Sequence, residues 1–239
     1  MRHRARVTHA DFYRDPVDEV TRELDVVADL AVQVGPDFQR QEVLFRLVAE
    51  CKGATDEASP WLILHRPEDT TYRAQTTQFL KICPHTGRDI SACLPDLHDA
   101  PLLAPDRRYG YQVVEAGPEE PTGPPVNRKA ASPYNATRQA AAAAWAQVIN
   151  SQPLPNHQLA LICLPVVVTS RSLVWASMND DGEMMLEEAD QPALLVSRQW
   201  DSGGRPRPLW ICNSKQVALL AQQAEQTAAA ISRQWRRGT

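Results

Sequence analysis

The chain has 239 residues, of which 43% are apolar and 23% are charged, a balance typical of a globular protein with a buried core. Its formal net charge of -4 excludes a global basic field, so binding to nucleic acid would depend on local clusters of Lys and Arg. No apolar run approaches the length of a membrane span, and the Arg-rich start does not resemble a signal peptide. We therefore expect a cytoplasmic protein without a membrane segment.

The first third of the chain is expected to form mainly strands. Apolar and β-branched residues occur there in runs bounded by Gly, Pro and Asp, which is typical of β-structure. These runs predict four strands, over residues 7–13, 20–34, 43–52 and 61–64. A short helix is predicted next, over residues 72–82.

Residues 83–129 are rich in Pro, Gly and Asp, and they predict an irregular insertion with at most one strand, over 111–115. Side chains of the types that bind zinc occur in it at four positions, Cys83, His85, Cys93 and His98. Their spacing is not that of a standard zinc knuckle. We favour an ordinary loop over a zinc site, because the intervening Gly87 to Asp89 has the composition of a turn.

The second half of the chain predicts two helices with strands between them. The alanine-rich stretch 130–150 favours a helix that starts near Ser132, and the periodicity of 214–235 favours a terminal helix. The strands are predicted over residues 159–168, 173–178, 184–188 and 209–212. Residues 179–182 have the composition of a hairpin turn, which we prefer to a cation site. The whole order predicts an α/β fold, a mixed central sheet flanked by helices, in a single domain over 1–239.

Charged residues occur at the end of one predicted strand and inside another, where an unpaired charge is costly and tends to mark a site. Glu50, Cys51 and Lys52 close the apolar run that starts at Val43, and Asp25 lies in the run before it. Successive side chains on a strand point to opposite faces, so Glu50 and Lys52 are expected to project side by side.

Pairing of these two runs would bring their acids together. The polar stretch around Gly35 and Pro36 is long enough to connect them as a hairpin. By alternation, Asp25 is expected to share a face with Thr21, Glu23 and Val27. Asp25 can then face Glu50 across the hairpin.

Two carboxylates on adjacent strands form a hard oxygen site suited to Mg²⁺ or Mn²⁺, which can share its remaining positions with water and a phosphate. Such a metal polarises a phosphoryl oxygen and activates water. Lys52 would lie beside that water or the phosphate, where its ammonium group can stabilise developing negative charge. The hypothesis is therefore a phosphodiesterase in which Asp25 and Glu50 hold the metal and Lys52 assists.

This pattern resembles the restriction-endonuclease-like, or PD-(D/E)xK, nuclease superfamily, whose motif is an acid on one strand and an acid-x-lysine on the next. Asp25 matches the first element, and Glu50-Cys51-Lys52 matches the second. The resemblance implies a restriction-endonuclease-like core, in which the catalytic hairpin precedes a helix and a further strand. It also implies metal-dependent hydrolysis of DNA, in restriction, repair or phage defence.

One feature departs from this family. Its members usually carry another glutamate on a helix before the first strand, and only residues 1–6 precede the first predicted strand here. Either the start lies upstream, or the acid comes from elsewhere, for example from Glu23, or the domain has lost full activity.

Two functions therefore stay open. The first is a DNA-cleaving enzyme, acting as a homodimer or with an activating partner. The second is a catalytically degenerate nuclease-like fold that binds nucleic acid or protein as a sensing module. A third interpretation of the motif is an ordinary solvated strand end, because acid and lysine pairs are common on protein surfaces.

Overall fold

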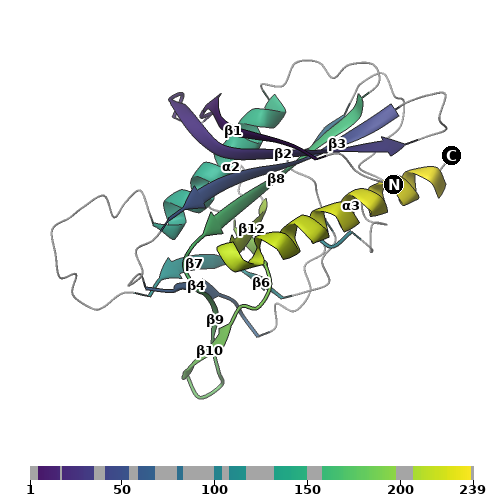
Figure 1. Cartoon of the computed structure of the whole chain (residues 1–239). Helices are drawn as coiled ribbons and strands as arrows, with labels where there is room; N and C mark the ends of the chain where they lie inside the picture. Colours follow the sequence, from purple (N-terminus) through teal and green to yellow (C-terminus); the bar gives the residue numbers. More distant parts are fainter. Residues whose placement is uncertain are drawn as a thin grey trace.

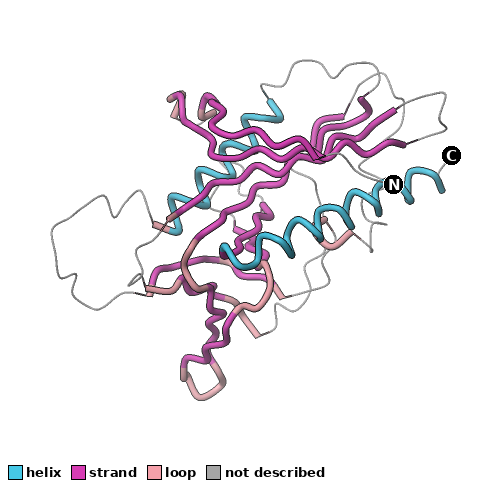
Figure 2. The backbone as a smooth tube through the Cα atoms, in the orientation of Figure 1, coloured by secondary structure: helices cyan, strands magenta, loops and turns pink. Residues whose placement is uncertain are grey.

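The computed structural model describes residues 5–16, 18–34, 41–53, 59–67, 80–82, 100–103, 108–116, 132–149, 158–197 and 207–237. These residues form a mixed α/β fold in which strands predominate and two helices pack against the sheet (Figures 1 and 2). The α/β class expected from the sequence is thus confirmed.

The strands are β1 (Ala5–Arg14), β2 (Thr21–Val34), β3 (Gln41–Lys52), β4 (Trp61–Leu64), β5 (Leu80–Ile82), β6 (Tyr109–Gly110), β7 (Gln112–Glu115), β8 (Gln158–Thr169), β9 (Leu173–Met178), β10 (Met184–Glu188), β11 (Ala193–Ser197) and β12 (Arg207–Asn213). The helices are α2 (Pro133–Ile149) and α3 (Val217–Arg237), and the 3-10 turn η2 (Ser214–Gln216) leads into α3.

The larger sheet has the strand order β1-β2-β3-β8-β12-β11-β6, with β5 paired to β8 outside this path. Strands β1, β2 and β3 form an antiparallel meander, whereas β8 runs parallel to both β3 and β12. Parallel neighbours need a crossover connection, and α2 precedes β8 on the return to the sheet. The β2–β3 hairpin therefore lies directly beside the strand that follows α2.

The two helices cover opposite faces of the larger sheet (Figure 1). Along β3, Phe45 and Leu47 point into a cluster with α3, while Leu44 and Val48 belong to a cluster with α2. This is the period-two alternation that was expected for residues 43–52. It puts Glu50, two positions beyond Val48, on the α2 face.

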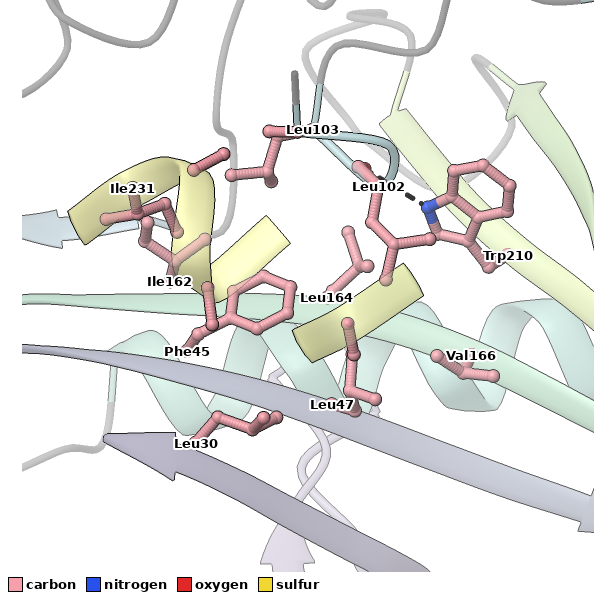
Figure 3. Close-up of a cluster of buried hydrophobic side chains, with 14 of the residues drawn as sticks. Leu30, Phe45, Leu47, Leu102, Leu103, Ile162, Leu164, Val166, Trp210 and Ile231 are labelled. Carbon is pink, nitrogen blue, oxygen red and sulfur yellow. Dashed lines mark hydrogen bonds between the residues drawn. The ribbon is translucent and has the colours of Figure 1, made fainter. Parts of the chain in front are cut away.

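The cluster under α3 is the largest apolar core of the described residues (Figure 3). Phe45 and Trp210 are completely buried in it, and the Trp210 Nε1–H donates to the carbonyl of Leu102 at 3.3 Å. Truncation of such a ring to Ala costs about 3–5 kcal/mol, because it loses transfer free energy and leaves a cavity. This core fixes one side of the β2–β3 hairpin.

A smaller sheet has the strand order β10-β9-β4-β7. Its buried residues include Trp61, Ile63 and Trp175, which share a cluster with Ala136 and Ala140 of α2. Small alanines let the first half of α2 approach both this cluster and the larger sheet. Helix α2 is thus fixed by packing on two sides.

Helix starts follow the sequence signals. The Ser132 hydroxyl accepts from the Asn135 amide at 3.2 Å, directly before Pro133 at the first helical position of α2. Asn213 caps η2 in a capping box, in which its side chain accepts from Gln216 and the Gln216 side chain accepts from the Asn213 amide. The helix predicted over 214–235 therefore begins with one 3-10 turn.

Three predictions need correction. The helix predicted over 72–82 is wrong at its end, because Leu80–Ile82 forms strand β5 beside β8, and the rest of that prediction lies outside the described residues. Two short strands, β6 and β7, occur where one strand was predicted within 83–129. Strand β11 was missed, since its apolar run is only a few residues long and follows Pro192.

None of the helices described here is long and apolar enough to cross a membrane.

Candidate functional site

The predicted acid and lysine of β3 form one contact pair. Lys52 Nζ lies 2.5 Å from Glu50 Oε1, and both side chains are on the face that α2 covers. Lys52 Nζ also donates to Gln139 Oε1 of α2 at 3.0 Å. The ammonium group is therefore held between a carboxylate of the sheet and an amide of the helix.

Glu50 is a buried carboxylate, with only 6% of its surface exposed. Burial raises the pKa of the Glu50 carboxyl, the ion pair with Lys52 opposes this rise, and the charge of Asp25 adds to it. Removing a charged group from water is costly unless it has partners. Lys52 is thus the partner that makes an ionised Glu50 tolerable in this position.

Asp25 lies on the neighbouring strand and binds the end of β3. Its Oδ2 accepts a hydrogen bond of 2.6 Å from the backbone amide of Cys51, the residue between Glu50 and Lys52. A hydrogen bond to a carboxylate is stronger than one between neutral groups. Asp25 therefore ties β2 to the strand end that carries the ion pair.

The face of β2 differs from the prediction. Leu24 and Val27, three residues apart, both belong to the cluster with α2, so strict alternation from Thr21 to Val27 does not hold. Ala10, which lies across from Asp25 between the pairs His9–Val26 and Asp11–Leu24, has a positive φ of 54°. At this distortion the side chains of β2 change face by one residue, so Arg22 rather than Glu23 lies on the face toward α2.

Glu23, the residue considered as a supporting acid, is exposed. Within the described ranges, no group of three or more His, Cys, Asp or Glu side chains could hold a metal ion. Two carboxylates lie at this end of the hairpin, and each has a partner: Asp25 accepts from the Cys51 amide, and Glu50 pairs with Lys52. Carboxylate oxygens are the ligand type that Mg²⁺ takes in proteins, commonly one or two of them with water and substrate phosphate.

Two residues of the site were missed from the sequence. Gln139 binds Lys52 through its side chain, and the Tyr13 hydroxyl donates to the Gln139 carbonyl at 3.3 Å. Burial raises the pKa of the Tyr13 hydroxyl, with Asp15 and Glu50 adding to the rise. A glutamine at the start of an alanine run gives a weak signal, and only the packing of α2 shows which face it occupies.

A second polar contact between the hairpin and α2 stabilises the register. Arg46 binds both oxygens of Asp29 across the hairpin, at 2.6 and 2.9 Å, and donates to Gln147 Oε1 at 2.6 Å. Asp29 and Arg46 are direct partners in the β2–β3 register. One helix thus contacts two ion pairs of the hairpin, through Gln139 and Gln147.

The other predicted sites have different outcomes. The four residues weighed as zinc ligands, Cys83, His85, Cys93 and His98, lie outside the described residues. The acidic stretch after β9 is a hairpin turn, as expected: Asn179 Oδ1 accepts from the Glu183 amide at 2.7 Å, and Gly182 has a φ of 79° that favours glycine.

Comparisons with protein-family models, with curated proteins and with solved structures find no match to this chain.

Proposed function

We propose that this protein is a metal-dependent nuclease that hydrolyses phosphodiester bonds of DNA. The observation that carries the proposal is the buried Glu50–Lys52 pair, which is held against Gln139 of α2 beside the carboxylate of Asp25. Two acids and a lysine on adjacent strands supply the groups that metal-assisted phosphate hydrolysis requires.

Each side chain has a distinct part in this chemistry. Asp25 and Glu50 would hold Mg²⁺ or Mn²⁺, which when bound supplies Lewis-acid activation of the phosphate and of water. Lys52 is kept at one position by Glu50 and Gln139, so its ammonium group can stabilise charge on a phosphate oxygen without reorganising. Gln139 acts as a positioning residue, because it contacts Lys52 rather than the phosphate.

The order of elements also supports the proposal. A restriction-endonuclease-like core is expected to have its catalytic hairpin before a helix and a further strand. Here the hairpin β2–β3 precedes α2, and β8 then pairs with β3. We infer such a core on this basis, together with a role in restriction, repair or phage defence.

Cleavage of plasmid and single-stranded DNA with Mg²⁺ or Mn²⁺ tests this function. The wild type is compared with Asp25→Asn and Glu50→Gln, which keep the side-chain volume but remove the charge. Glu188→Gln is the matched control, because Glu188 is exposed on β10 of the smaller sheet. Circular dichroism and thermal unfolding check that each variant folds.

We expect metal-dependent cleavage by the wild type and the control, and its loss in both site variants. Equal cleavage by Glu50→Gln and wild type would overturn the proposal. If the wild type and all variants bind DNA and none of them cleaves it, the result would favour the catalytically degenerate binding module instead.

A further inference from the structure

A second polar cluster lies beside this site, between the β1–β2 turn and α2. Arg22 Nε contacts Asp15 Oδ2 at 2.8 Å, and Arg22 Nη2 contacts Asp18 Oδ2 at 2.6 Å. Arg138 of α2 reaches the same Asp18 Oδ2 through its Nη2 at 2.9 Å. One carboxylate oxygen therefore accepts from two guanidinium groups on different elements.

The two acids of this cluster differ in burial. Only 1% of the Asp15 side chain is exposed, whereas 35% of the Asp18 side chain is exposed. The hydrogen bonds from Arg138 and Arg22 hold the pKa of Asp18 below its ordinary value, so Asp18 is an anion at neutral pH. Asp15 is a fixed partner of Arg22, and Asp18 is the anion that a solvent-borne group could replace.

The position of the cluster relates it to the candidate active site. Arg138 directly precedes Gln139, which binds Lys52. Arg22 lies close enough to Glu50 for its charge to lower the pKa of that carboxyl. Arg22 and Arg138 are therefore guanidinium groups in the neighbourhood of Glu50 and Lys52, where a bound strand with one phosphate at the candidate site could bring another.

We propose that Arg22 and Arg138 form a binding site for a backbone phosphate of DNA, and that Asp18 occupies this site when DNA is absent. Guanidinium groups that converge on one carboxylate oxygen can receive a phosphate oxygen in the same way. The proposal rests on the proposed nuclease function, since it names where a substrate strand is held.

Charge explains why such a site would be useful here. The four side chains of the cluster, two Arg and two Asp, sum to zero while Asp18 is bound. When a phosphate replaces Asp18, Arg22 still pairs with Asp15, and the phosphate is the anion that both guanidinium groups contact. An overall acidic chain with a net charge of -4 can in this way hold DNA locally without a general affinity for polyanions.

The same turn contains a matched control pair. Arg14 Nη2 contacts Glu19 Oε2 at 3.2 Å, with 67% and 77% of the two side chains exposed. Glu19→Gln removes the same charge as Asp18→Asn one residue away, and Arg14→Gln matches Arg138→Gln. Any general effect of charge in this turn will therefore appear in both pairs.

The test is DNA binding by the full chain in a Glu50→Gln background, which blocks the proposed cleavage. Fluorescence anisotropy of a labelled DNA duplex and of a single strand gives Kd over a range of salt concentrations. The variants are Asp18→Asn, Arg138→Gln, their double mutant, and the two controls. Thermal unfolding of each variant identifies any loss of folding.

Asp18→Asn is expected to tighten DNA binding about 3- to 10-fold, because it removes the internal competitor for the phosphate. Arg138→Gln is expected to weaken binding and to reduce the slope of log affinity against log salt by about 1. In the double mutant the gain from Asp18→Asn disappears, whereas the controls change Kd less than about 2-fold.

Equal changes in Asp18→Asn and Glu19→Gln would overturn the proposal, as would unchanged binding in Arg138→Gln. If Asp18 only fixes the turn, its substitution lowers the unfolding temperature and brings no gain in affinity. Because the assay measures binding alone, a wild type that binds DNA but does not cleave it would overturn the nuclease function and leave this result standing.

Discussion

The β2–β3 and β9–β10 hairpins both carry acids, and they differ in what covers them. At the end of β2–β3, Glu50 is buried, paired with Lys52 and covered by α2. In the β9–β10 hairpin, the strand β10 is exposed along its whole length, and Glu183 lies in a turn. The comparison teaches that an acid at a strand end is buried and paired where a helix packs over it, and is solvated where no helix does.

Arginine pairs show the same contrast. Arg46 donates to both carboxylate oxygens of Asp29, and 19% of the Arg46 side chain and 19% of the Asp29 side chain are exposed. Arg108 likewise donates to both carboxylate oxygens of Glu187, at 2.7 and 3.1 Å, but 65% of the Glu187 side chain is exposed. Similar geometry in different surroundings allows the energetic value of burial to be measured within one molecule.

The largest expected effect is that of Lys52→Met on cleavage. Loss of the ammonium group should lower the cleavage rate by about 100-fold or more, because a preorganised charge beside the phosphate is removed. Lys215→Met, at an exposed residue of η2, is the control and should cleave at the wild-type rate. Rates are measured with labelled DNA at saturating Mg²⁺, and equal rates for the two variants would remove Lys52 from the mechanism.

Arg46→Met tests the contrast between the arginine pairs. The change leaves Asp29 and Gln147 without their partner and should lower the free energy of unfolding by about 2–3 kcal/mol. Arg108→Met is expected to cost less, since solvent screens its exposed partner. Urea unfolding of both variants gives the difference, and a larger loss for Arg108→Met would contradict this view of burial.

The pH dependence of stability tests the burial of Glu50. Its folded-state pKa is raised above the ordinary value of 4.5, so the folded chain binds this proton more tightly than the unfolded chain. The corresponding stability is present below pH 4.5 and is lost as pH rises through the folded pKa. Glu50→Gln lacks this loss, so wild type should become less stable relative to the variant as pH rises.

Urea unfolding of wild type and Glu50→Gln across this pH range measures the difference. A stability difference that does not change with pH would contradict a raised pKa. Under the proposed function, cleavage should have the opposite dependence and increase with pH through the same pKa, because a metal held by Glu50 would require the ionised carboxylate.

The smallest expected effect is in the β9–β10 hairpin. Asn179→Ala removes the hydrogen bond to the Glu183 amide and should lower the free energy of unfolding by about 0.5–1 kcal/mol. Cleavage should not change. Thermal unfolding and a cleavage assay check both, and a loss of cleavage would give this exposed hairpin a functional role.

Much of the fold could be predicted because its signals are local. The strands β4, β9 and β10 and the alanine-rich α2 follow from apolar runs and helix propensity. Strand β5 could not be predicted, since its three residues are a strand only because they pair with β8. Tertiary pairing decides such short segments.

The site was predictable only in its strand residues. Alternation placed Glu50 and Lys52 together, and the structure confirms that they are in contact. The slip at Asp25 lies across from Ala10, whose positive φ is a backbone distortion that an alanine does not signal in the sequence. Gln139 and Arg138 join the site through the packing of α2, which no local pattern reveals.

The most direct test of the site is the binding of Mn²⁺ to the protein without DNA, measured by isothermal titration calorimetry. We predict that wild type and Glu188→Gln bind the metal equally and that Asp25→Asn and Glu50→Gln each lose most of the affinity. Glu23→Gln, measured beside them, shows whether this exposed acid contributes. Unchanged Mn²⁺ binding in both Asp25→Asn and Glu50→Gln would contradict a metal site at the end of the β2–β3 hairpin.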